Sequence, residues 1–118
     1  MIIQKGVEMK GLCRQIKKIL RILEVIYARA GNRLIIKGTL MGFDKSRSAH
    51  EAGRAIDIES PIRKRIDVYT RIRLSLGLNY IVRQQDTHMH IEWAPMSTET
   101  LKVERYVHER LERSVKKC

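Results

Sequence analysis

The chain has 118 residues, of which 43% are hydrophobic, and it carries a formal net charge of +11 at pH 7. This length and composition predict one folded domain around a single core and argue against a disordered chain. With one Trp and one Phe, that core has to be mostly aliphatic. No apolar run is long enough to span a bilayer, and residues 1–18 lack the uninterrupted apolar segment of a signal peptide. We therefore expect synthesis and folding in the cytosol.

The strong positive charge predicts attraction to a polyanion, which can be nucleic acid, anionic lipid or an acidic cell-wall polymer. Charge alone does not distinguish these partners, and a solubilising surface is the simpler alternative. Cys13 and Cys118 lie near opposite ends of the chain, without a CxxC motif or metal-ligand spacing. We assign no function to these two thiols.

Hydrophobic periodicity predicts the elements of the first half of the chain. Apolar residues recur at intervals of three and four over residues 12–29, which is typical of an amphipathic helix, and Gly31 is placed to end it. Residues 33–40 predict a short strand and residues 55–59 a second one. Between them, residues 41–50 are polar and predict an irregular loop long enough to carry function.

In the second half, Ser60 and Pro61 have the residue types of a helix start, and Gly77 is placed to end that helix. Residues 79–84 and 88–93 predict a hairpin, and a last, highly charged helix is expected over about residues 97–115. The expected buried face of the helix that follows Pro61 consists of Ile62, Ile66, Tyr69, Ile72 and Leu76. The sequence thus predicts a single α+β domain over residues 1–118, with a small, mostly antiparallel sheet flanked by helices.

Side chains alternate across the predicted strand 88–93 and separate into a polar and an apolar face. The apolar face has an obvious place in the core, whereas the polar face predicts a cleft. The polar face consists of His88, His90 and Glu92, and the apolar face of Met89, Ile91 and Trp93.

The same alternation places Asp57 opposite its apolar neighbours in the strand 55–59, and a carboxylate there needs a partner. Two imidazole nitrogens and one carboxylate oxygen form a recurring catalytic zinc site, and His50, Asp57 and His90 can supply these atoms. The alternative is purely structural. In that case His50 caps its loop, Asp57 forms a salt bridge with Arg54, and the histidines are merely exposed.

Two motifs carry a resemblance to a known family. The stretch "SAHEAGRAIDI", followed by "HMHIEW", resembles the zinc D-Ala-D-Ala carboxypeptidase family, which includes the vancomycin-resistance D,D-dipeptidases and phage L-alanyl-D-glutamate endolysins. The hedgehog signalling domain shares the fold of this family. The family pattern is Ser-x-His-x-x-Gly-x-Ala-x-Asp, then His-x-His. The matching residues are Ser48, His50, Gly53, Ala55 and Asp57 for the first part and His88 and His90 for the second.

The resemblance covers about residues 30–95 and implies a hedgehog/DD-peptidase-like fold. It implies one zinc ion per chain, held by His50, Asp57 and His90. The implied activity is hydrolysis of peptide bonds in peptidoglycan by zinc-activated water, as a D,D-carboxypeptidase or as an L,D- or D,D-endopeptidase.

Many relatives have a catalytic carboxylate shortly before the last zinc histidine, and here Thr87 occupies the place three residues before His90. Asp86, one residue further back, is the first candidate for the general base. His88 is the second, because family members use the first histidine of the pair within the active site. Glu92 is the third, and it alternatively orients a metal ligand.

Relatives also often carry a substrate-binding Arg before the zinc motif, in a stretch similar to Ser-Gly-Tyr-Arg, where this chain has Leu40. Without that Arg, an endopeptidase, a changed specificity and a binding-only descendant are alternatives to strict D-Ala-D-Ala cleavage. The substrate-binding candidates near the motif are Ser48, Arg47 and Arg54, with Lys37 and Lys45 as further cations.

The resulting hypothesis is a zinc metallopeptidase that acts on peptidoglycan peptides and is concentrated on the anionic cell wall by its charge. Small size and the lack of a signal peptide suit a phage lysin that acts at the wall. A catalytically silent, hedgehog-like zinc-binding domain is the first alternative. A basic nucleic-acid-binding protein is the second, although the sequence has no aromatic-rich basic patch that would support it.

Overall fold

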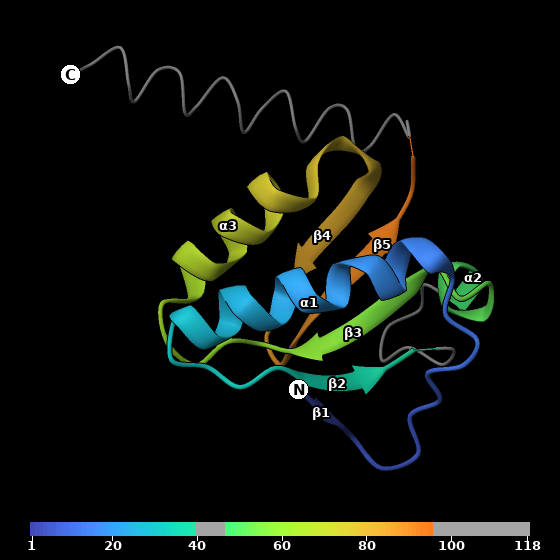
Figure 1. Cartoon of the computed structure of the whole chain (residues 1–118), viewed down its shortest axis with the longest axis horizontal. Helices are drawn as coiled ribbons and strands as arrows, with labels where there is room; N and C mark the ends of the chain where they lie inside the picture. Colours follow the sequence, from blue (N-terminus) through green and yellow to red (C-terminus); the bar gives the residue numbers. More distant parts are fainter. Residues whose placement is uncertain (40–46, 96–118) are drawn as a thin grey trace.

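The computed structural model describes residues 1–39 and 47–95, with only the backbone of Arg47 and Ser48. Within these ranges the chain forms an α+β domain with a five-stranded mixed sheet, three α-helices and one 3-10 turn (Figure 1). In chain order the elements are β1 (Ile2–Ile3), α1 (Arg14–Arg29), β2 (Ile35–Gly38), α2 (Arg47–Glu51), β3 (Ala55–Glu59), α3 (Arg65–Leu76), the 3-10 turn Gly77–Asn79, β4 (Tyr80–Gln84) and β5 (His88–Trp93).

The strand order in the sheet is β1-β2-β3-β5-β4, so β3 is the central strand. It pairs in antiparallel fashion with β2 and β5, and β4 and β5 form the predicted hairpin. The pairing of β1 with β2 is parallel, which makes the sheet mixed. Strand β1 was not predicted, because a strand of two residues has no periodic pattern.

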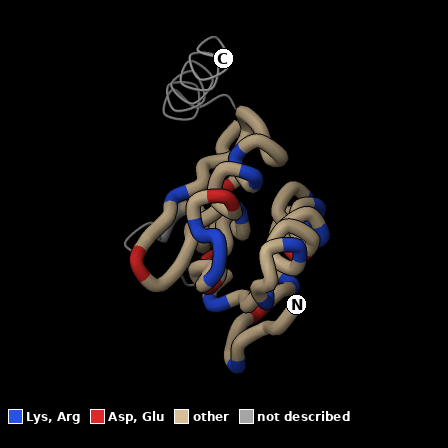
Figure 2. Tube along the Cα trace, turned by 90° about the vertical axis from the view of Figure 1, so that its left-hand side faces the viewer, with Lys and Arg blue, Asp and Glu red and all other residues tan. Residues whose placement is uncertain are grey.

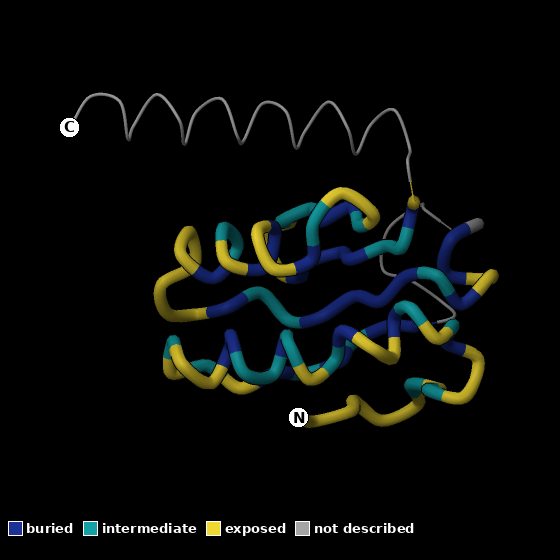
Figure 3. The backbone as a smooth tube through the Cα atoms, turned by 45° about the horizontal axis from the view of Figure 1, so that its top comes forward, coloured by how far each residue is buried: buried dark blue, intermediate teal, exposed yellow. Residues whose placement is uncertain are grey.

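The core is aliphatic, as predicted, and lies between the sheet and the two long helices. Helices α1 and α3 contact each other and pack against one face of the sheet (Figure 1). That face carries Ile56 and Ile58 of β3 and Met89 and Ile91 of β5, all of them fully buried. Figure 3 shows the buried stretches in the strands and along the inner sides of the helices. Trp93 is only half-buried at the edge of this core.

The expected helix from Ser60 starts later than predicted, because α3 begins at Arg65 after Lys64 in a left-handed conformation with φ 52°. Its buried face includes Val68, Ile72 and Leu76. Ile66 is two residues, about 200°, away from Val68 on the helix and is 80% exposed. Ile62 precedes the helix and is 89% exposed. The prediction that these two isoleucines are buried is therefore wrong.

The predicted irregular loop 41–50 is also wrong in its last part, because α2 begins at Arg47 and carries His50 in a helical turn. Residues 40–46 and 96–118 lie outside the described residues, and with them the last helix predicted at 97–115. None of the described helices is long and apolar enough to cross a membrane.

Gly53 lies in the turn between α2 and β3 and contacts the start of α1. Its φ of +71° is in the left-handed region, and a Cβ at this position would lie 2.0 Å from the carbonyl oxygen of Gly11. Its N–H donates to the His50 carbonyl at 2.9 Å, and its own carbonyl accepts from the N–H of Cys13 at 2.8 Å. The turn between His50 and Asp57 therefore needs glycine for both its conformation and its close contact.

We expect Gly53→Ala to lower the free energy of unfolding by more than about 2 kcal/mol, since it adds a backbone clash to the cost of a positive φ. The control is Gly6→Ala, where φ is +87° but nothing lies within 4 Å of the added Cβ. Urea unfolding of both variants measures the difference. Equal losses would contradict the close contact at Gly53.

Candidate metal centre

Three side chains from three different elements meet on the sheet face opposite the core. His50 comes from α2, Asp57 from β3 and His90 from β5, and all three are fully buried. Asp57 and His90 are direct partners in the antiparallel pairing of β3 with β5. Each residue offers one ligand atom, and these atoms all lie within 4.8 Å of one another. The group has the composition and the spacing to hold a metal ion.

Asp57 is the centre of the group, because each of its carboxylate oxygens faces one imidazole. Its Oδ2 lies 3.4 Å from His50 Nε2, and its Oδ1 lies 3.0 Å from His90 Nδ1. The two imidazole rings meet edge to face with centroids 5.0 Å apart. Carboxylate oxygens only accept hydrogen bonds, so each of these contacts is a hydrogen bond when the facing nitrogen carries a proton.

The outer nitrogen of each imidazole has its own partner. Nδ1 of His50 contacts the backbone carbonyl of Thr39, and Nε2 of His90 lies 3.1 Å from Glu92 Oε1. Because both partners are acceptors, each outer nitrogen carries the proton and the inner nitrogen can present its lone pair to the group. In metal sites, ligating histidines typically have such a carbonyl or carboxylate on the second nitrogen.

The charges around the group shift two pKa values. Burial lowers the pKa of His50, but the hydrogen bonds with Asp57 and the Thr39 carbonyl outweigh burial and raise this pKa above its ordinary value. The hydrogen bond from His90 lowers the pKa of Glu92, against burial, and the positive charges of Arg83 and Arg54 lower it further. Glu92 is therefore a carboxylate at neutral pH.

A metal ion fits this donor set. Nε2 of His50 is fully buried and the atom it faces, Asp57 Oδ2, lies 3.4 Å away, so a metal ion in the group would satisfy it. Two imidazoles and one carboxylate are typical ligands of zinc and of similar transition metals, whereas Mg²⁺ and Ca²⁺ prefer oxygen ligands. The three residues supply three of the four ligands that zinc usually takes.

The structure brings together the three predicted metal ligands and adds Glu92 at their edge. His88 lies on the same face of β5, opposite Glu59 of β3, and is 8% exposed. Asp86, the first candidate for the base, lies in the exposed turn between β4 and β5. Arg65 of α3 donates to the backbone carbonyl of Asp86 at 3.0 Å. Glu92 is in hydrogen-bond contact with His90, a ligand of the group.

The substrate-binding candidates divide into described and undescribed side chains. Arg54 is half-buried, and its Nη1 donates to the Trp93 carbonyl at 3.3 Å, at the end of β5 that carries Glu92. Lys37 lies half-buried on β2. Arg47 and Ser48 belong to α2, but their side chains are outside the description, as are Leu40 and Lys45.

Two residues at the site were not predicted. Thr39 contributes only its backbone carbonyl, for which a sequence has no signal. Arg83 lies opposite His90 in the β4–β5 pairing, so its side chain shares the face of the group. The predicted three-residue turn 85–87 would have placed Val82 opposite His90, whereas the observed pairing of Gln84 with Met89 leaves a shorter turn, so the predicted turn length did not indicate this register.

Comparison of the chain with models of protein families, with curated proteins and with solved structures finds no match in any of the three. The resemblance to the zinc D-Ala-D-Ala carboxypeptidases therefore rests on its two motifs alone, and its implied fold and activity stay predictions.

The raised pKa of His50 predicts that the stability of the metal-free protein and the stabilisation by zinc depend on pH in opposite directions. In the metal-free protein, the His50–Asp57 pair contributes stability fully below the ordinary histidine pKa of 6.5 and loses it as the pH rises through the raised pKa. Zinc requires the unprotonated imidazole, so the stabilisation by zinc grows over the same range. Urea unfolding between about pH 5.5 and 8.5, with chelator or with zinc, measures both trends.

His50→Gln is the control for this measurement, since it removes the titrating group and should flatten both trends. A metal-free wild type that gains stability relative to His50→Gln as the pH rises would contradict the predicted protonation of His50.

Proposed function

We propose that this chain is a zinc-dependent peptidase that cleaves peptide bonds in peptidoglycan. The observation that carries the proposal is the buried group of His50, Asp57 and His90, in which one ligand atom from each residue lies within 4.8 Å of the others. The two motifs that resemble the carboxypeptidase family contain these three residues. Structural zinc sites are usually closed by four protein ligands, and three ligands are typical of catalytic sites.

In this proposal His50, Asp57 and His90 hold the ion, and the residues around them fix its ligands. When bound, zinc supplies a Lewis acid for the scissile carbonyl and lowers the pKa of water toward neutrality. The Thr39 carbonyl holds the proton of His50 on Nδ1, which keeps Nε2 available as a ligand atom. Glu92 does the same for His90, because its carboxylate accepts from Nε2 and leaves Nδ1 to face Asp57.

The proton transfer needs a second group, because peptide hydrolysis requires a base for water and an acid for the leaving amine. Glu92 is occupied with His90, and this favours a positioning role for Glu92. His88 lies two residues from His90 on the same strand face and is our preferred base. Asp86 is the alternative, and it would have to reach the group from the exposed turn.

The substrate class follows from charge and from the resemblance. Peptide stems of peptidoglycan carry carboxylates, and Arg54 and Arg83 place positive charge beside Glu92 at the edge of the group. These two arginines are the candidates for binding a substrate carboxylate, since this chain has Leu40 where relatives often carry their Arg. The net charge of +11 favours accumulation on anionic cell-wall polymers.

The test is digestion of purified peptidoglycan by the full chain with one equivalent of zinc. We expect new free amines, their loss when a chelator is added, and a product mass that identifies the cleaved bond. His88→Gln should keep zinc and lose at least about a hundredfold in rate, as expected for removal of a general base. Asp86→Asn is its control and should retain near-wild-type turnover.

Glu92→Gln separates positioning from catalysis in the same assay. We expect it to weaken zinc binding by about tenfold or more, as loss of an outer partner does, and to recover much of its rate at saturating zinc. Zinc binding without release of amines would instead support the catalytically silent zinc domain. Full activity of His88→Gln with loss in Asp86→Asn would assign the base to Asp86.

A further inference from the structure

One end of the molecule combines exposed aliphatic side chains with several exposed cations. We call it the basic–apolar end. It includes the chain from the last turn of α1 to β2 and from the end of β3 into α3 (Figure 1). Its residues are Ile62, Ile66, Arg29, Arg33, Arg63, Lys64, Arg65 and Arg71, all of them exposed.

The exposure of Ile62 is built into the local fold. Asn32 fixes the segment before α3 with three hydrogen bonds, since its Oδ1 accepts from the N–H groups of Ile62 and Arg63 and its Nδ2 donates to the Arg63 carbonyl. Pro61 is buried, which turns the next side chain outward. Ile66 lies on the outer face of the first turn of α3. The two isoleucines are therefore held in solvent by a defined backbone.

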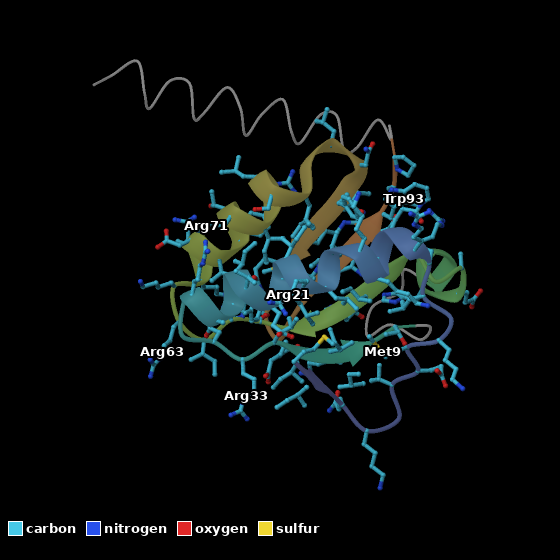
Figure 4. All side chains as sticks on the ribbon, in the orientation of Figure 1. Met9, Arg21, Arg33, Arg63, Arg71 and Trp93 are labelled. Atoms are coloured by element: carbon cyan, nitrogen blue, oxygen red, sulfur yellow. The ribbon has the colours of Figure 1, made fainter. Side chains whose placement is uncertain are left out.

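Cations lie beside these isoleucines, since Arg33 and Arg63 line one hollow together with Ile62. Figure 2 looks at this end and shows Lys and Arg positions on it, and Figure 4 shows the side chains of Arg33 and Arg63 pointing away from the domain. A hollow of about 610 Å³ between α1 and α3 has Arg29, Lys64 and Arg71 in its lining, together with Asp67.

A second hollow, of about 620 Å³, contains both apolar and basic side chains. Ile62, Arg33 and Arg63 are part of its lining, and Glu59 is its acidic member. Cations thus outnumber acidic side chains in both hollows. The surface offers positive charge beside the exposed aliphatic groups.

We propose that the basic–apolar end binds the surface of an anionic lipid bilayer. Aliphatic side chains that enter the boundary between headgroups and acyl chains, with Lys and Arg around them, are the common signature of interfacial binding. Each Lys or Arg near an anionic membrane raises the binding affinity by about tenfold or less. The aliphatic side chains that insert into the bilayer add binding that does not depend on charge. Lipid phosphates would lie against the cations that line the two hollows.

Nucleic acid is the other polyanion that this surface could bind through its charge. Such binding would not use the two exposed isoleucines. Affinity for nucleic acid comes largely from phosphate contacts, and stacking on bases needs planar side chains. The basic–apolar end lies at the Glu59 end of β3, whereas α2 with His50 lies at the Ala55 end (Figure 1). Membrane binding at this surface would therefore not cover α2, and the inference does not depend on the proposed peptidase activity.

The test is sedimentation of the full chain with vesicles of phosphatidylglycerol and phosphatidylcholine in equal parts, and with vesicles of phosphatidylcholine alone. We expect binding to the anionic vesicles, weak binding to the neutral ones, and weakening by salt. The double variant Ile62→Ser/Ile66→Ser should bind anionic vesicles at least about tenfold more weakly. Since both side chains are exposed, its unfolding temperature should equal that of the wild type, which is measured alongside.

Matched variants show whether the location of the residues matters. Arg63→Gln/Lys64→Gln should also lose about tenfold or more, whereas Lys17→Gln/Lys18→Gln, which removes two exposed cations from α1, should lose much less. Wild-type binding by the double isoleucine variant would overturn the proposal, as would equal losses for the two charge variants. Duplex DNA that displaces the protein from vesicles, and binds the isoleucine variant as well as the wild type, would assign the surface to nucleic acid.

Discussion

The buried carboxylate of Asp57 is the constraint on which the site depends. An ionised carboxylate removed from water is costly unless charges or hydrogen bonds compensate it, and Asp57 is fully buried in the central strand of the sheet. His50 and His90 each face one of its oxygens, so the three residues form one unit. Removing any one member leaves buried polar atoms without compensation.

The surrounding fold positions these three residues through the pairing of β3 with β5 and through the segments that hold His50. The β3–β5 pairing places Asp57 opposite His90, and a shift by one residue would move either side chain into the core. Gly53 makes the turn that brings α2 back to β3, and the Thr39 carbonyl at the end of β2 fixes the imidazole of His50. The core face of the same strands packs on α1 and α3, so the packing that stabilises the domain also fixes the register of the group.

Much of this arrangement could be predicted from the sequence, because alternation within strands is a strong local signal. It placed Asp57 and His90 on the polar face of their strands, and β3 has the predicted bounds. The sequence could not show that Ile62 and Ile66 are exposed, since the start of α3 depends on the buried Pro61, the Asn32 contacts and the left-handed Lys64. The sequence also could not show that Glu92, and not Asp86, lies next to His90, because this depends on which residues form the hairpin turn.

The central claim is that the buried group binds a metal ion through His50, Asp57 and His90, and X-ray absorption at the zinc edge tests it most directly. Protein loaded with one equivalent of zinc should show scattering from two imidazoles together with oxygen ligands. The His50→Ala and His90→Ala variants should each lose an imidazole or fail to retain zinc, while His88→Ala, from the same strand as His90, should keep both imidazoles. A spectrum without imidazole scattering, or one that is unchanged in His50→Ala and His90→Ala, would contradict the account.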